Sequence, residues 1–183
     1  MQKVQRSEIL DYETYEEQRE GVRAQILKTK EPRRIHVGDH LTFLFENTDT
    51  VRYQIQEMVR TERLVKESAI QHEVDTYNEL LGDPGELGCV LLIEYPTPEE
   101  RDVQLRKLLG LPAKLYMTTE NGKRAYAQFD ARQVGEQRLS SVQYLKFDTQ
   151  GSAPVSIGTE HPEMMLEFDL LPEQKTALKA DLA

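Results

Sequence analysis

In the second half of the chain, several sequence patterns typical of β-strands follow one another. From residue 115 onward, turn signals separate these patterns, and no helical pattern lies between them. Residues 115–119 and 124–129 flank Asn121–Gly122, a dipeptide typical of a tight β-hairpin. Further strand patterns follow at 141–147 and 165–170. Parallel neighbours need crossover connections of a dozen or more residues, so these strands predict an antiparallel sheet rather than a doubly wound fold.

The first half of the chain is mainly helical in pattern. Apolar residues at three- and four-residue steps predict an N-terminal helix over 11–30 and a helical hairpin at about 50–65 and 69–81. A short strand pair at 34–37 and 41–46 is predicted to turn at Gly38–Asp39.

These patterns predict an α+β fold with a largely antiparallel sheet, an N-terminal helix, a helical hairpin and further short helices. The length of 183 residues fits one domain over 1–183. Within it, the loop Gly82–Gly85 separates a mainly helical sub-structure, 1–81, from a mainly sheet sub-structure, 86–183.

Charge and cysteine content exclude several classes of partner. A net charge of −9 repels nucleic-acid backbones and anionic lipid. No apolar run approaches the roughly 20 residues that span a bilayer. Cys89 has no partner for a disulfide within the chain, as is usual in a reducing compartment. We therefore expect a cytoplasmic protein that binds neither nucleic acid nor membrane.

Two carboxylates interrupt the apolar stripes of the helical hairpin. Glu62 falls near the middle of the stripe in the first helix, and Glu73 falls inside the edge of the stripe in the second. An unpaired buried carboxylate is too costly to keep ionised, so each must find a cation, a metal ion or a proton. We expect both to be substantially buried and at least one to be paired with an arginine, for which Arg19 of the N-terminal helix is the main candidate.

A candidate polar cluster follows from this pattern: Arg19, Glu46, Asp49, Glu62 and Glu73. One interpretation is an ionic network that fixes helix register. Another is a pocket whose carboxylates bind a hard divalent cation or share a proton. An interface between subunits is the third. The sequence leaves all three open.

Metal ligands are only weakly indicated. The candidates are Glu62 and Glu73, together with His36 and His40, which flank the Gly38–Asp39 turn. Histidines in a turn are more often solvated or bonded to local backbone. The chain has no glycine-rich phosphate loop, dinucleotide-binding turn or serine nucleophile elbow.

Several stretches resemble one family along nearly the whole chain. They are His36–Gly38, Leu44–Thr50, Gln54–Met58, Gln71–Leu80, Gln143–Phe147 and the His161–Pro162 loop. They are similar to an uncharacterised bacterial and archaeal family, domain of unknown function 3501. The resemblance implies association with a redox or oxidative-stress system and carries over no catalytic residues.

The function expected from the sequence is that of an accessory or binding protein with a protein partner or self-association. The alternative is a metal-dependent enzyme that uses the carboxylate cluster of the helical hairpin with a divalent metal as cofactor. Whether the protein is an enzyme is left open by the sequence.

Overall fold

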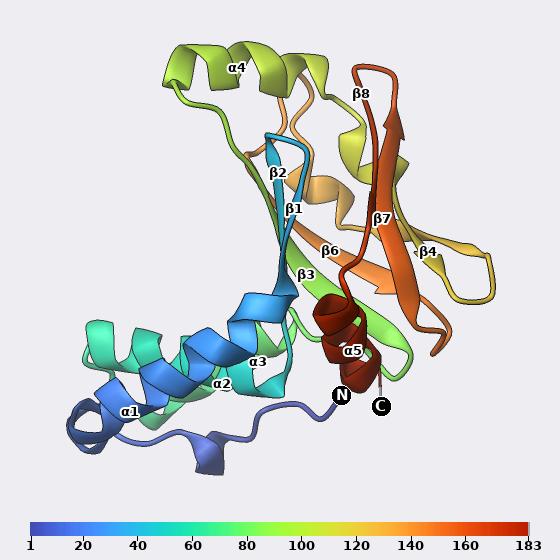
Figure 1. The fold of residues 1–183 in the computed structure, drawn as a ribbon. Helices are drawn as coiled ribbons and strands as arrows, with labels where there is room; N and C mark the ends of the chain where they lie inside the picture. The colour runs from blue at the N-terminus through green and yellow to red at the C-terminus, as the bar shows by residue number, and fades with distance from the viewer. Residues whose placement is uncertain (183) are drawn as a thin grey trace.

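The structure, a computed structural model, describes residues 1–182 (Figure 1). Its α-helices are α1 (Tyr12–Lys30), α2 (Thr48–Thr61), α3 (Glu67–Asn78), α4 (Pro98–Lys107) and α5 (Pro172–Asp181). Its strands are β1 (Arg34–Val37), β2 (Leu41–Phe45), β3 (Glu86–Ile93), β4 (Leu115–Thr119), β5 (Arg124–Gln128), β6 (Val142–Asp148), β7 (Pro154–His161) and β8 (Met164–Asp169). Short 3₁₀ turns include η1 (Arg6–Glu8) and η2 (Glu31–Arg33).

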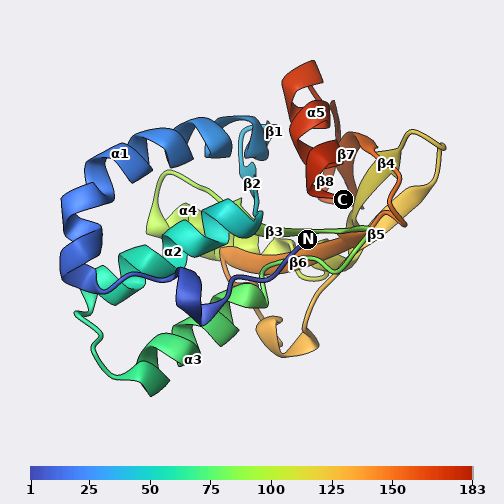
Figure 2. The ribbon, with the colours of Figure 1, turned by 90° about the horizontal axis from the view of Figure 1, so that it is seen from below.

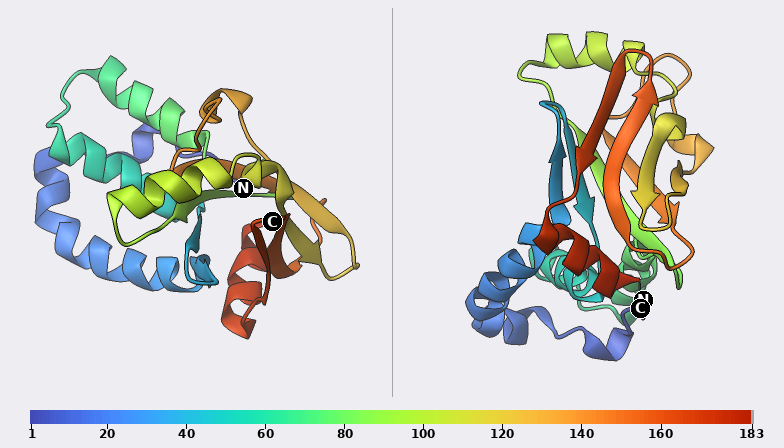
Figure 3. Two further views of the ribbon diagram at one scale, coloured as in Figure 1. Left: turned by 90° about the horizontal axis from the view of Figure 1, so that it is seen from above. Right: turned by 45° about the vertical axis from the view of Figure 1, so that its right-hand side comes forward.

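All eight strands form one sheet in the order β1-β2-β3-β6-β5-β4-β7-β8. Every neighbouring pair is antiparallel, which confirms the predicted α+β class. The sheet twists until its two edge strands meet, so that it is nearly a closed barrel (Figure 3). At this seam a Cβ on Gly38 would lie only 2.8 Å from Cδ1 of Leu166.

The inner face of the sheet carries the larger hydrophobic core. Inward-facing side chains alternate with outward-facing ones along each strand, as in Leu87, Cys89, Leu91 and Ile93 of β3, which are all buried. Leu105 of α4 and Leu178 of α5 join this core. The two helices lie toward opposite ends of the barrel (Figure 1).

A second hydrophobic cluster holds the helical layer together. It joins the N-terminal arm to the helical hairpin through Val4, Ile9, Val51, Ile55, Val59, Ile70, Val74 and Leu81. Asn78 anchors the arm, because its side chain accepts from the Val4 amide and donates to the Val4 carbonyl, each at 2.9 Å. The three N-terminal helices lie to one side of the sheet (Figure 2).

The two sub-structures expected from the sequence, 1–81 and 86–183, both contribute strands to the one sheet. The β1–β2 hairpin belongs to the first half of the chain, yet β2 pairs with β3 along Leu41–Phe45. At Gly88 of β3 the layers approach so closely that a Cβ would lie 1.8 Å from the Leu80 carbonyl oxygen. Among the described residues, no helix is long and apolar enough to cross a membrane.

Candidate functional site

The residues of the predicted polar cluster are dispersed over the helical layer. Asp49 lies in the first turn of this helix, whereas Glu62 is its C-cap. At 1.5 Å per residue, the helix holds these two positions roughly 20 Å apart. Asp49 and Glu62 therefore do not share a cation in one pocket.

The prediction that Glu62 is buried is wrong, because the helix ends before this residue. Arg63 has a left-handed φ of 49°. Its amide donates to the Arg60 carbonyl, and the Leu64 amide donates to the Val59 carbonyl at 3.0 Å. This is a Schellman termination, which turns the chain away from the apolar stripe. Glu62 is consequently exposed.

Arg19 does pair with a carboxylate of α2, but that carboxylate is Glu57 rather than Glu62 or Glu73. The Arg19 guanidinium donates Nε to Oε1 at 2.8 Å and Nη2 to Oε2 at 3.0 Å. The Tyr15 hydroxyl donates to the same carboxylate at 2.7 Å. Burial alone would raise the pKa of Glu57, but these hydrogen bonds outweigh it and lower the pKa to about 2. Glu73 is half-buried and pairs with no arginine of residues 1–182.

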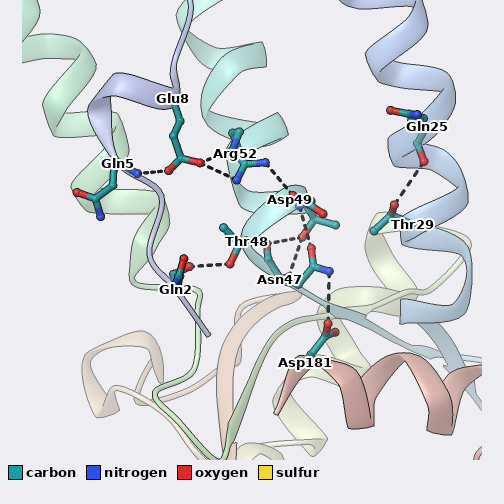
Figure 4. Close-up of polar contacts among 11 residues, drawn as sticks. Gln2, Gln5, Glu8, Gln25, Thr29, Asn47, Thr48, Asp49, Arg52 and Asp181 are labelled. Carbon is teal, nitrogen blue, oxygen red and sulfur yellow. Dashed lines mark hydrogen bonds and ion pairs between the residues drawn. The ribbon is translucent and has the colours of Figure 1, made fainter. Parts of the chain in front are cut away.

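Asp49 is also neutralised by an arginine. Arg52 bridges it to Glu8 of the N-terminal arm, with contacts of 2.7 Å to each carboxylate (Figure 4). Asp49 and Arg52 line a cleft of about 580 Å³ between α1 and α2. Asp49 is exposed, so its role is that of a surface ion pair beside this cleft.

Glu46 differs from the other carboxylates of the predicted cluster because its side chain is desolvated without a direct contact to a cation. It is half-buried just after β2 and makes no ion pair with any residue that the structure describes. Desolvation raises the pKa of its carboxyl group, although a hydrogen bond from Thr50 and the charges of Lys30 and Arg33 oppose that rise. A desolvated carboxyl group that borders a cleft is a candidate for a functional site.

Glu46 lines a pocket of about 520 Å³ between the end of α1 and the outer face of the β1–β2 hairpin. The other lining residues are Leu27, Lys30, Glu31, Arg33, Arg34, His36, Leu44 and Phe45. We call this the Glu46 pocket. It contains two of the residues predicted from the sequence, Glu46 and His36.

The two neighbouring arginines of the Glu46 pocket have different surroundings. Arg33 forms a bidentate pair with Asp181 of α5, at 2.7 and 2.8 Å, and donates to the Thr29 carbonyl. Asn47 donates to the same aspartate at 3.4 Å (Figure 4). Arg34 is exposed and has no hydrogen bond or ion pair within residues 1–182. Its guanidinium is therefore available to a ligand.

Hydrogen bonds connect both turn histidines, His36 and His40, to Glu94. His36 Nδ1 lies 2.9 Å from the Thr42 hydroxyl, which donates to a Glu94 carboxylate oxygen at 2.5 Å. His40 Nδ1 lies 2.9 Å from the Glu94 carbonyl oxygen, and its ring stacks on Tyr95 at 4.1 Å between centroids. No three His, Cys, Asp or Glu side chains in the described part of the chain gather as a metal centre.

Sequence reasoning missed Glu57, Glu94 and Asp181. Their partners lie 38, 52 and 148 residues away, respectively.

A larger cleft of about 680 Å³ lies between α3 and the sheet. Aromatic side chains of Tyr77, Phe129 and Tyr144 line it, with Lys3 and Lys146 among its charged residues. None of the acidic or histidine candidates borders this cleft. Cys89 borders it but is buried, and desolvation raises the pKa of its thiol well above the usual range.

Comparisons with known proteins place the chain in a family without assigning an activity. No curated protein matches it. A solved structure, described as a novel protein of unknown function from Burkholderia pseudomallei K96243, has 29% sequence identity and a TM-score of 0.89, with 100% of each chain covered. The sequence profile of one family matches residues 3–182. The chain therefore belongs to the family described as Protein of unknown function (DUF3501).

Proposed function

We propose that the protein is a non-catalytic binding protein whose Glu46 pocket holds a small molecule with a carboxylate group and an apolar body. The observation that carries this proposal is the pairing pattern. Arg19, Arg33 and Arg52 are each matched to a carboxylate, whereas Arg34 at the Glu46 pocket is not. An unpaired guanidinium is suited to bidentate recognition of a carboxylate.

The apolar part of the ligand is suggested by the lining of the pocket. Leu27 lines the pocket and is 55% exposed, so it offers apolar surface that a ligand can cover. Leu44 and Phe45 lie on the β2 side. The volume of about 520 Å³ falls within the usual range for small-molecule sites. A chain of several methylene groups would cover Leu27 while its carboxylate reaches Arg34.

Glu46 supports the same ligand through its protonation state. A carboxyl group whose pKa is raised more readily keeps its proton, and a protonated carboxyl can donate a hydrogen bond to a bound carboxylate. The negative ligand in turn favours the protonated form of Glu46. Binding should therefore take up a proton and tighten as the pH falls.

The test is a calorimetric titration with octanoate, using octanol and octylamine as neutral and cationic probes of the same length. Octanoate should bind most tightly. Arg34→Gln should weaken octanoate binding at least tenfold, because hydrogen bonds to charged groups contribute about 1.5–3 kcal/mol. Glu46→Gln should keep binding but lose its pH dependence, since the amide donates at every pH.

Arg101→Gln is the matched control. Arg101 is another arginine without an ion pair among the described residues, and it lies on α4, outside the lining of the Glu46 pocket. This variant should bind octanoate as the wild type does. Equal affinity for octanoate and octanol, or an unchanged affinity in Arg34→Gln, would overturn the proposal.

The geometry disfavours one of the other functions expected from the sequence, and the remaining expectations are still predictions. The metal-dependent enzyme needed Glu46, Asp49, Glu62 and Glu73 in one pocket, but α2 holds Asp49 and Glu62 at its opposite ends. Association with a redox system, a protein partner and a cytoplasmic location stay predictions. Cys89 adds nothing to the redox proposal, because its buried thiol has a raised pKa and is a poor nucleophile.

A further inference from the structure

The proton positions on His36 follow from its hydrogen bonds. The Thr42 hydroxyl has a single proton, and its contact of 2.5 Å with the Glu94 carboxylate uses that proton. The hydroxyl oxygen must then accept from His36 Nδ1, which lies 2.9 Å away. Neutral His36 therefore carries its proton on Nδ1, and Nε2 keeps a free lone pair.

His40 also carries its proton on Nδ1, but a different contact determines this. Its Nδ1 lies 2.9 Å from the Glu94 carbonyl oxygen, which can only accept, so Nδ1 carries the proton. Stacking on Tyr95 at 4.1 Å fixes the plane of the ring. Neither His36 nor His40 has a hydrogen-bond partner for Nε2 within the described residues 1–182.

One residue thus orients both rings. Glu94 follows β3, and its amide donates to the His40 carbonyl at 2.8 Å, so the backbone beside β2 fixes the position of His40. The carboxylate of the same residue fixes His36 through Thr42, which is 2% exposed. His36 pairs with Thr42 across the β1–β2 hairpin, and His40 lies two positions before Thr42, so the two imidazoles belong to neighbouring positions of one hairpin, each with an unused Nε2.

We infer that His36 and His40 bind a divalent transition metal ion such as Zn²⁺, Ni²⁺ or Cu²⁺ through their Nε2 atoms. Histidine ligands of metals characteristically donate the other ring N–H to a carbonyl or carboxylate, which sets the tautomer and strengthens the ligand. Imidazole nitrogens suit this group of metals. With two protein ligands, the remaining coordination positions are open to water or to a small molecule.

The other two histidines do not share this arrangement. His161 is 6% exposed; its Nε2 lies 3.0 Å from the Leu109 carbonyl oxygen, and its Nδ1 accepts from the Glu163 amide at 3.3 Å. His72 is exposed on α3 and has no hydrogen bond that fixes its ring in the part of the chain described. Both serve as controls for nonspecific binding to imidazole.

The first experiment is a titration of the protein with Zn²⁺ or Cu²⁺ alone, followed by calorimetry and by NMR of the histidine rings. One ion per chain should bind, with shifts at His36 and His40. His40→Gln should weaken binding at least tenfold, whereas His72→Gln should leave it unchanged. Equal loss in the two variants, or no stoichiometric binding, would overturn the inference.

Two further measurements do not depend on removing a ligand. In the metal-free protein, ¹⁵N correlation spectra should show His36 protonated on Nδ1, and the opposite tautomer would contradict the inference. Thr42→Val keeps both ligands and the shape of the side chain but removes the orienting hydroxyl; it should weaken metal binding about tenfold. A circular dichroism spectrum equal to that of the wild type verifies that each variant folds.

The metal site and the Glu46 pocket can be tested separately. Arg34→Gln should leave metal affinity unchanged, and His40→Gln should leave octanoate affinity unchanged, since His40 does not line the Glu46 pocket. Failure of either proposal therefore leaves a distinct pattern in the two titrations.

Discussion

Neutralising Glu57 should remove a large, pH-dependent part of the stability of the helical layer. This carboxylate is 16% exposed and accepts hydrogen bonds from Arg19 and Tyr15. Its pKa falls from 4.5 to about 2 on folding. Since each pKa unit corresponds to about 1.4 kcal/mol, the shift corresponds to roughly 3 kcal/mol of stability at neutral pH.

The sign of the pH dependence follows from the lowered pKa. The contribution is fully present above about pH 4.5, the value expected for the unfolded chain, and is lost as the pH falls toward 2. At about pH 3, roughly half of it or less should remain. Glu57→Gln lacks the charge at every pH, so the difference between wild type and variant should shrink from pH 7 to pH 3.

The assay is urea denaturation of wild type and Glu57→Gln at several pH values, in urea rather than guanidinium so that ionic strength stays low. Glu62→Gln is the control, because Glu62 is exposed at the C-cap of the same helix and its substitution should change the free energy of unfolding by less than about 0.5 kcal/mol. A cost for Glu57→Gln that is the same at pH 7 and pH 3 would refute the reasoning, as would an equal cost for Glu62→Gln.

Three further predictions concern the backbone and the core. Arg63→Gly should raise the free energy of unfolding by about 0.5–1 kcal/mol, because the left-handed φ of 49° is costly for any residue with a Cβ; a loss of stability would contradict the helix termination described. Gly88→Ala should lower the free energy of unfolding by about 3 kcal/mol or more, since its Cβ would lie 1.8 Å from the Leu80 carbonyl oxygen. Gly21→Ala should raise it by about 1 kcal/mol, because Gly21 lies on α1 with open space around it. Urea denaturation of both variants measures the contrast. Cys89 should react with a thiol reagent only after the protein is unfolded, and fast labelling of the native protein would show that the thiol is accessible.

Elements with local determinants were predictable from the sequence. The β4–β5 hairpin turns at Asn121–Gly122, and β1–β2 turns at Gly38–Asp39, because turn chemistry acts over a few residues. The curl of the sheet was not predictable in this way. It depends on pairings such as β3 with β6 and β4 with β7, which join segments far apart in the chain.

The candidate site was predicted only in part, for the same reason. Glu46 and His36 do line one pocket. Glu62 was misplaced because helical periodicity was extended past Arg63, where the backbone leaves the helix. The choice of Glu57 as the partner of Arg19 depends on how α1 packs on α2, a contact between residues 38 positions apart.

The ion pair between Arg33 and Asp181 has a consequence for biosynthesis. A ribosome makes Arg33 long before Asp181, because 148 positions separate them. Until α5 emerges and docks, the guanidinium must stay hydrated, since burying it without its partner costs several kcal/mol. The chain can assemble its helical layer during translation, but the side of the barrel beside η2 must wait for the last helix to be made.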